Sequence, residues 1–126
     1  MPTLCERLLR YEKLDRFDKS SLTYVSITSG HLSLDAAQSF GEKVCPRYYE
    51  AYASTDCGQI TVLTPEDRGS FGDSVGKPIW CVRVKIDDDG REMRVGEEGE
   101  ICLRTPLAIQ SYYRNPPATV EFLAGG

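Results

Sequence analysis

Few side chains in this sequence have the chemistry of catalysis or metal binding. None of the five cysteines forms a Cys-x-x-Cys pair, and the single histidine, His31, has no thiol or carboxylate at metal-ligand spacing. A zinc site and a disulfide-stapled secreted domain are therefore not expected, and the thiols are predicted to be reduced and packed as small apolar groups. What remains is a hydroxyl beside a carboxylate, Thr55-Asp56. Such a pair often only stabilises a turn, and that interpretation stands beside a functional one.

Short motifs surround this pair and follow one another along the chain. They are Tyr49-Glu-Ala-Tyr-Ala-Ser-Thr-Asp-Cys-Gly58, then Asp73-Ser-Val-Gly-Lys-Pro78, then Gly99-Glu-Ile-Cys-Leu-Arg-Thr-Pro106 with Tyr112-Tyr-Arg-Asn-Pro116 behind it. Their order resembles the adenylate-forming (AMP-binding) superfamily, which shows Tyr-Gly-x-Thr-Glu, Gly-Ser-Val-Gly-x-Pro and Gly-Glu-Ile-x-x-Arg-Gly. The strings Gly-Glu-Glu-Gly-Glu-Ile-Cys and Asn-Pro-x-Ala-Thr look most like acyl-CoA synthetases. The resemblance covers essentially the whole chain and implies an internal fragment of the large N-terminal domain of such a ligase.

The resemblance also implies an activity and its partners. Acyl-CoA synthetases couple a carboxylic acid to ATP, release pyrophosphate and pass the acyl-adenylate to coenzyme A. The implied cofactors are ATP or AMP, Mg²⁺ and coenzyme A, and the implied partners are a small carboxylic acid and the remainder of the chain's own polypeptide. A formal charge of -4 without clustered Lys and Arg argues against a nucleic-acid partner. No apolar run approaches the ~20 residues that span a bilayer, so no membrane span is expected. The reduced thiols predict a cytoplasmic protein.

By the same resemblance, Thr55 and Asp56 are the catalytic residues. Thr55 would donate its hydroxyl to the adenylate phosphate. Asp56 stands where the family has a glutamate that binds Mg²⁺, a cation that prefers hard carboxylate oxygens. Because aspartate is one methylene shorter, it would reach the metal through water, or the turn would move inward. Tyr52 matches the aromatic residue that stacks on adenine, and packing in the core is its alternative role.

The other residues expected at the nucleotide are Ser29, Gly30, Glu50, Ala51, Ala53 and Ser54. Glu50 stands where relatives carry an amide that meets the adenine amino group, and a solvated charge is an equally weighted alternative. Ala53 replaces a glycine, which is tolerable unless the position needs a positive φ. The segment Thr28–Leu32 aligns with the family's Gly-Gly-Ala-Pro-Leu turn. In it, His31 is read as a loop residue, and in the last motif Tyr112 is expected to be chiefly structural.

These residues need a framework of helices and strands to position them. Hydrophobic spacing predicts a helix over 3–12, a strand over 22–27, a helix over 34–44 capped by Ser33, and a short strand into 48–50, the order of a parallel sheet with crossovers. After Cys57 the pattern predicts a loop over 64–73, a strand over 80–86, a hairpin turn at 87–90 and a strand over 100–104.

The predicted fold class is α/β: a fragment with a parallel βαβ-type segment over residues 1–58, ending in the adenylate-binding motif, followed by a β-rich, distorted barrel-like segment over 59–126. Both are expected to belong to one larger AMP-binding domain. The 126 residues hold no Ser/Thr/Gly-rich phosphate loop with a lysine, no Arg-Thr-Gly-Asp segment and no C-terminal domain with a catalytic lysine. We therefore expect the chain alone to be inactive. Two alternatives stay open, a non-catalytic nucleotide-binding remnant and an adenylating enzyme with a carrier-protein acceptor. Aryl, fatty and branched acids all remain candidate substrates.

Overall fold

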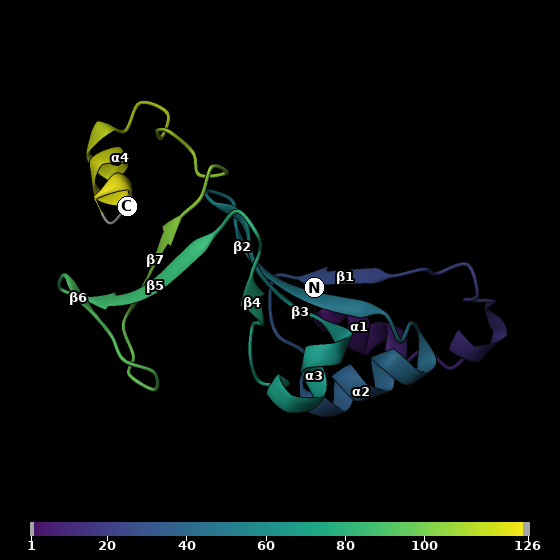
Figure 1. Ribbon diagram of the computed structural model, residues 1–126. Coiled ribbons are helices and arrows are strands. Elements are labelled where there is room, and N and C mark those ends of the chain that lie inside the picture. Colours follow the sequence, from purple (N-terminus) through teal and green to yellow (C-terminus); the bar gives the residue numbers. More distant parts are fainter. Residues whose placement is uncertain (1, 125–126) are drawn as a thin grey trace. The chain divides into compact units, whose positions relative to one another are not determined.

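The computed structural model describes residues 2–124 and divides into two compact units (Figure 1). The first unit contains the chain up to Ala53 together with Gln59–Lys77, and the second contains Ser54–Gly58 and the chain from Pro78 onward. This division differs from the one expected at residue 58. Most of strand β3 and helix α3 group with the first unit, and the turn after strand β2 groups with the second.

The first unit is built on a parallel βαβ segment, as predicted. Its elements up to this point are α1 (Pro2–Leu9), a short 3-10 helix η1 (Leu14–Arg16), β1 (Val25–Thr28), α2 (Leu34–Lys43) and β2 (Tyr48–Ser54). Strands β1 and β2 pair in parallel from Val25 opposite Tyr48 to Thr28 opposite Ala51. Ser33 caps α2 as expected, because its side chain accepts a hydrogen bond from the backbone nitrogen of Ala36 at 3.3 Å.

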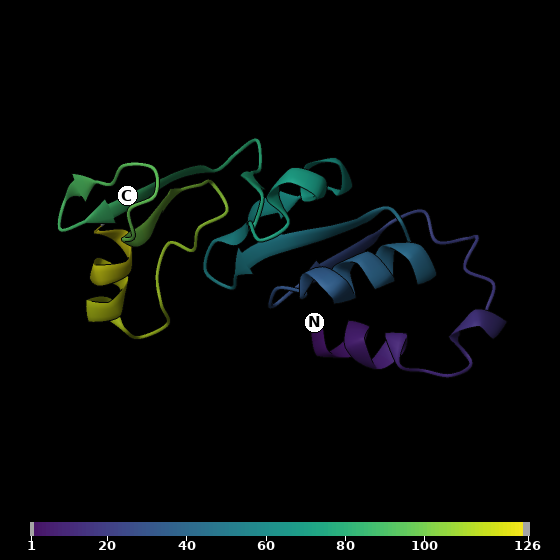
Figure 2. The same cartoon turned by 90° about the horizontal axis from the view of Figure 1, so that it is seen from below.

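Helices α1 and α2 lie on the same face of this sheet in both ribbon views (Figures 1 and 2). The buried residues between them and the sheet form one cluster, Cys5, Ile27, Leu32, Ala37, Phe40 and Tyr48. Tyr48 is central, since its hydroxyl donates to the carbonyl of Ala37 at 2.8 Å and its ring meets that of Phe40 edge to face at 5.3 Å. Because side chains alternate along a strand, Tyr48 and Glu50 face this core and their neighbours face the opposite side.

The segment expected to be a loop over 64–73 is instead a helix. Strand β3 (Gly58–Leu63) is followed by α3 (Pro65–Phe71). Thr64 caps α3 by accepting from the backbone nitrogen of Asp67 at 3.2 Å, and proline at the first helical position has no N–H to leave unpaired. The loop prediction was wrong because Thr-Pro-Glu-Asp, taken there as turn composition, is also a helix start signal.

Strand β4 (Lys77–Pro78) completes the first sheet, whose strand order is β1-β2-β3-β4. Gly76 precedes it with φ +83°, and a Cβ built on Gly76 would overlap the carbonyl group of Val62 and the nitrogen of Leu63. The hydroxyl of Thr61 donates to the carbonyl of Val75 at 2.5 Å beside this contact. The chain around Gly76 is thus packed backbone against backbone on β3.

The second unit is β-rich, as predicted, with an antiparallel sheet of order β6-β5-β7. Its elements are β5 (Arg83–Asp88), β6 (Arg91–Glu92), β7 (Glu100–Arg104) and the helix α4 (Pro116–Leu123). The hairpin turn at 87–90 is confirmed, with positive φ at Asp89 (51°) and Gly90 (81°). The strand expected from Trp80 begins at Arg83, and the Trp80 side chain is 96% exposed, so the predicted alternation was wrong at its start.

Helix α4 was not predicted. Its cap is Asn115, whose side chain accepts from the backbone nitrogen of Ala118 at 3.3 Å.

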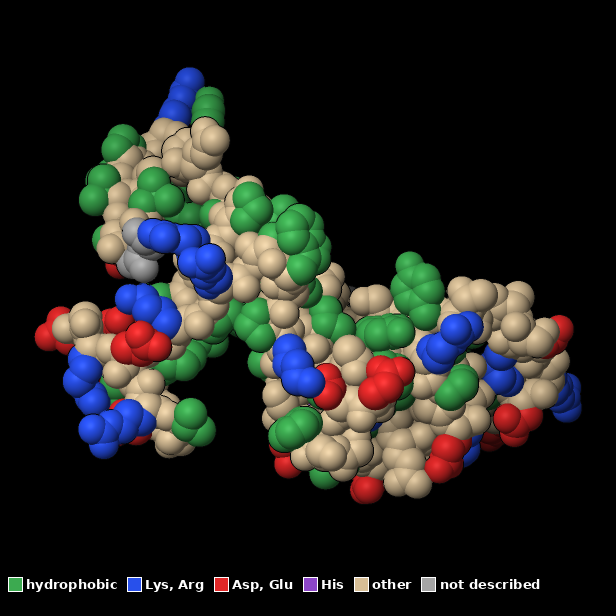
Figure 3. All heavy atoms as spheres, in the orientation of Figure 1, with side chains coloured by type: hydrophobic (Ala, Val, Ile, Leu, Met, Phe, Trp, Pro, Cys, Tyr) green, Lys and Arg blue, Asp and Glu red, His purple; other side chains and the backbone are tan. Residues whose placement is uncertain are grey.

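Around β5 and β6, acidic and basic side chains are intermixed on the visible face (Figure 3), without a patch of one sign. Among residues 2–124, no helix is long and apolar enough to cross a membrane.

Candidate functional site

The turn that follows β2 carries the two residues expected to be catalytic. Thr55 is exposed, Asp56 is half-buried and Cys57 is buried. The side-chain bond that closes this turn comes from Ser54, whose hydroxyl accepts from the backbone nitrogen of Cys57 at 3.0 Å. Within the described residues, neither Thr55 nor Asp56 makes a side-chain hydrogen bond inside the turn. The turn-stabilising interpretation of this pair and the functional one both stay predictions.

Asp56 makes its contacts within the second unit, with residues far along the chain. Its Oδ2 accepts from the hydroxyl of Tyr112 at 2.8 Å, and its carbonyl oxygen accepts from the backbone nitrogen of Ile109 at 2.8 Å. The hydrogen bond to Asp56 raises the pKa of the Tyr112 phenol, because the protonated form is the donor. Tyr112 thus remains a hydrogen-bond donor throughout the neutral pH range.

The carboxylate of Asp56 suits a magnesium ion held partly by a substrate. One oxygen is bound by Tyr112, and no other described side chain hydrogen-bonds Oδ1. The described residues contain no group of three or more His, Cys, Asp or Glu side chains arranged to hold a metal. Mg²⁺ is commonly held by one or two carboxylates together with substrate phosphates rather than by an all-protein cage. The donor set is compatible with that mode, in which Asp56 would be the protein ligand.

Glu50, in the first unit, is buried, with 5% of its surface exposed. The solvated-charge alternative is therefore wrong. Its Oε2 accepts from the backbone nitrogen of Leu32 at 3.2 Å and lies 3.2 Å from Nδ1 of His31, and its Oε1 lies 3.4 Å from a guanidinium nitrogen of Arg68. Both carboxylate oxygens thus have partners within the protein, and the contact of Glu50 with adenine stays a prediction.

Arg68, a residue that the sequence analysis did not single out, reaches Glu50 from helix α3. Its guanidinium also donates to the carbonyl of Tyr48 at 3.2 Å and lies 3.6 Å from the centre of the Tyr48 ring. Burial raises the pKa of the Tyr48 phenol. The only signal for Arg68 was its place in the first turns of α3, and that helix was itself expected to be a loop.

The turn between β1 and α2 carries Ser29 and Gly30, both expected at the nucleotide. Ser29 is exposed and has φ 72°, and Gly30 has φ 146°. A Cβ at Gly30 would lie 2.9 Å from Cγ of Pro2, so in this unit it is helix α1 that approaches the bare backbone. Leu32, hydrogen-bonded to Glu50, anchors the far end of the turn in the core.

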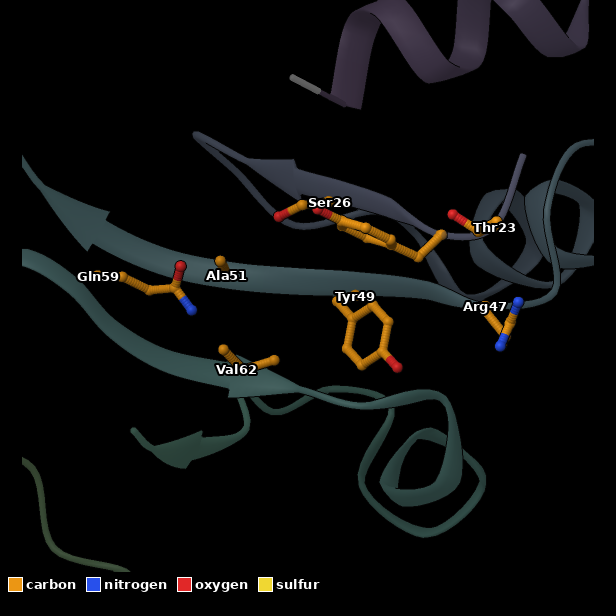
Figure 4. Close-up of a pocket in the computed structure, with 8 residues that line it drawn as sticks. Thr23, Ser26, Arg47, Tyr49, Ala51, Gln59 and Val62 are labelled. Atoms are coloured by element: carbon orange, nitrogen blue, oxygen red, sulfur yellow. The ribbon is translucent and has the colours of Figure 1, made fainter. Parts of the chain in front are cut away.

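The predicted nucleotide-binding stretch of β2 is divided between the two faces of the strand. Ala51 lines a groove of about 550 Å³ on the face away from the core, together with Arg47 and Tyr49 (Figure 4). Glu50 faces the core, and Tyr52 is 36% exposed near the strand end. Ala53 has no positive φ, so its Cβ is tolerated there. The structure does not bring Glu50 and Ala51 to one surface.

The predicted site residues are also divided between the two compact units of the chain. Ser54, Thr55 and Asp56 belong to the second unit with Tyr112, whereas Ser29, Gly30 and the stretch 50–53 belong to the first. Within the second unit, the hydroxyl and carboxylate expected to be catalytic are neighbours on one turn. Their assignments as ligand contacts stay predictions.

The parallel βαβ segment and the β-rich segment after it are the architecture that the sequence resemblance implied. A sequence profile for the family described as AMP-binding enzyme matches residues 1–113. The chain belongs to the AMP-binding enzyme family.

Curated relatives agree with this membership. The chain is 30% identical over 126 residues to a long-chain-fatty-acid–CoA ligase of Salmonella typhimurium, covering 98% of this chain and 22% of the ligase. It is 35% identical over 128 residues to a luciferin 4-monooxygenase of Luciola mingrelica, covering 96% of this chain and 22% of that enzyme. The chain thus spans about a fifth of the length of these relatives.

Solved structures show the same fold. The amide bond synthetase McbA from Marinactinospora thermotolerans matches with a TM-score of 0.88 and 29% identity, over 99% of this chain and 26% of that protein. The o-succinylbenzoate CoA synthetase MenE from Bacillus subtilis, in complex with its acyl-adenylate intermediate, matches with a TM-score of 0.79 and 29% identity, over 93% of this chain and 24% of that protein. The α/β fold class is therefore confirmed.

Proposed function

We propose that this chain is part of an ATP-dependent acyl-CoA synthetase that converts a carboxylic acid to an acyl-adenylate and then to a coenzyme A thioester. The observation that carries the proposal is the Thr55-Asp56 turn. Its threonine hydroxyl is exposed, and Oδ1 of Asp56 accepts no hydrogen bond from any residue that the structure describes. Membership in the AMP-binding family supports it. So does the similarity to ligases whose names specify CoA.

In this proposal the chain's residues bind and orient the nucleotide. Thr55 donates its hydroxyl to the adenylate phosphate, a group that short hydroxyl donors bind well. Asp56 holds Mg²⁺, which when bound supplies positive charge beside the phosphates. Tyr52 is proposed to offer its aromatic face to adenine, and Ser29 and Gly30 are proposed as further nucleotide contacts.

The chain alone is proposed to be inactive. Pyrophosphate departure develops negative charge, and these 126 residues lack the phosphate-loop lysine and the catalytic-lysine domain that the superfamily uses. ATP–pyrophosphate exchange should therefore be undetectable with the purified chain and detectable with a complete protein containing it. The complete protein should also form a CoA thioester when given fatty, aryl and branched acids in turn. Exchange by the chain alone would refute the proposed inactivity, and no exchange by the complete protein with any acid would refute the ligase proposal.

A different acyl acceptor is the second candidate. The similarity to an amide bond synthetase favours it, because that protein's name specifies an amide product rather than a thioester. Replacing CoA by an amine or by a carrier-protein thiol in the same assay separates the two candidates. Saturable AMP binding by a protein without exchange activity would instead support a nucleotide-binding remnant. The proposed location is the cytoplasm.

A further inference from the structure

Asp56 is held from two directions in the second unit. Ile109 donates its backbone N–H to the Asp56 carbonyl, and the Tyr112 hydroxyl donates to Oδ2, each at 2.8 Å. Tyr112 lies 56 residues further along the chain than Asp56. The turn after β2 is therefore anchored, at backbone and at side chain, by the segment that follows β7.

Tyr112 is itself fixed by helix α4. Its backbone nitrogen donates to the hydroxyl of Thr119 at 3.0 Å, and its ring meets that of Phe122 edge to face at 5.6 Å. The Thr119 hydroxyl in turn donates to the carbonyl of Asn115, the residue that caps α4, at 2.9 Å. A continuous series of contacts thus leads from the start of α4 to the carboxylate of Asp56.

We infer that Tyr112 is a positioning residue for Asp56: by holding Oδ2 it leaves Oδ1 as the oxygen that meets a divalent cation. This inference rests on the proposed function, in which Asp56 is the metal ligand. A carboxylate that binds a metal is commonly hydrogen-bonded by an outer group that fixes its orientation, and loss of such a group costs roughly 10- to 100-fold in metal affinity.

The neutral phenol suits this role better than a cation would. A lysine or arginine at this position would cancel the charge that attracts the metal, whereas a hydroxyl orients the carboxylate and leaves its charge in place. Aspartate has one rotatable bond fewer than glutamate, so a single hydrogen bond restricts its carboxylate more tightly. The hydrogen bond from Tyr112 thus limits the rotation of the half-buried Asp56 side chain on its turn.

The test uses the 126-residue chain, labelled with ¹⁵N and titrated with MnCl₂ alone. Mn²⁺ accepts the oxygen ligands that Mg²⁺ accepts, and its paramagnetism broadens nearby amide resonances. In the wild-type chain the amides of residues 55–57 should broaden first, and Asp56→Asn should abolish that local effect. Tyr112→Phe, which keeps the ring on Phe122, should require about tenfold more Mn²⁺ for the same broadening.

The matched control is Tyr113→Phe. Tyr113 is the next residue along, but its side chain is 83% exposed and its hydroxyl makes no hydrogen bond within the described residues. The control should titrate as the wild type does. If Tyr112→Phe fails to fold in a thermal scan, Thr119→Val replaces it, because that change removes the acceptor of the Tyr112 N–H and leaves both tyrosines; it should also weaken Mn²⁺ binding.

Two results would overturn the inference, and they are distinguishable. Equal titrations of wild type and Tyr112→Phe, with local broadening that Asp56→Asn removes, would leave Asp56 as a metal ligand and remove the positioning role. No local broadening in the wild-type chain would overturn the metal role of Asp56, and the positioning role with it.

Discussion

Breaking the ion pair of Arg68 and Glu50 should destabilise the first unit far more than breaking a shorter pair nearby. Arg68→Met keeps the apolar stem and removes the guanidinium. It leaves the Glu50 carboxylate, with 6% of its side chain exposed, without its guanidinium partner, and it deletes the hydrogen bond to the Tyr48 carbonyl and the stacking on the Tyr48 ring. Removing one partner of a buried pair costs about 3–5 kcal/mol. Glu50 retains the Leu32 amide and His31, so we expect the low end, about 3 kcal/mol.

The matched control is Lys77→Met. Lys77 lies 2.7 Å from Asp67, closer than the 3.4 Å between Arg68 and Glu50, but its side chain is 69% exposed. Exposed pairs contribute at most about 1 kcal/mol, so burial and not distance should decide the ranking. The expected loss for this variant is less than about 1 kcal/mol.

The assay is urea unfolding followed by far-ultraviolet circular dichroism, because the single tryptophan, Trp80, lies in the second unit. The free energy of unfolding is extrapolated to zero denaturant for each variant. Adding Glu50→Gln to Arg68→Met should recover part of the loss, since a neutral amide leaves no unpaired charge. Equal losses for the Arg68 and Lys77 variants, or a loss below about 1 kcal/mol for Arg68→Met, would refute the reasoning.

Three further outcomes are expected. Thr64→Ala should cost about 1 kcal/mol in the urea assay by removing the cap of α3, and an unchanged midpoint would contradict the capping role. Burial raises the pKa of the Tyr48 phenol, so its contribution to stability should be complete below about pH 10 and fall as the pH rises further; Tyr48→Phe should flatten that decline in urea midpoints measured from pH 8 upward. The half-buried thiols of Cys81 and Cys102 should react with Ellman's reagent faster than the buried thiols of Cys5, Cys45 and Cys57. Equal reaction rates would contradict this burial pattern.

The regular elements of the first unit could be predicted from sequence because their signals are local. Ser33 and the apolar spacing after it specify α2. The hairpin at Asp89-Gly90 follows likewise from residues that accept positive φ. Helix α3 was missed because Pro65-Glu66 serves equally in a turn and in the first turn of a helix. Its few apolar residues left no periodicity to decide between them.

The contacts of the candidate site were beyond sequence reasoning for a different reason. Thr55 and Asp56 were found through a motif, but the partners of Asp56 come from residues more than fifty positions away. Glu50 illustrates the same limit, since its burial depends on Arg68 from a helix that was not expected. A charged residue in a strand indicates neither the face it occupies nor the cation that neutralises it.

Gly76 affects how the motif Asp73–Pro78 should be interpreted. A Cβ built on Gly76 would overlap the carbonyl group of Val62, and its φ lies in the left-handed region, so no L side chain fits there. A library randomised at this codon and selected only for soluble protein, with no nucleotide present, would therefore return glycine. The glycine of the motif Asp73–Pro78 is thus required by backbone packing on strand β3 and not by a bound nucleotide. A chain that had lost every ligand would still keep this glycine in order to fold.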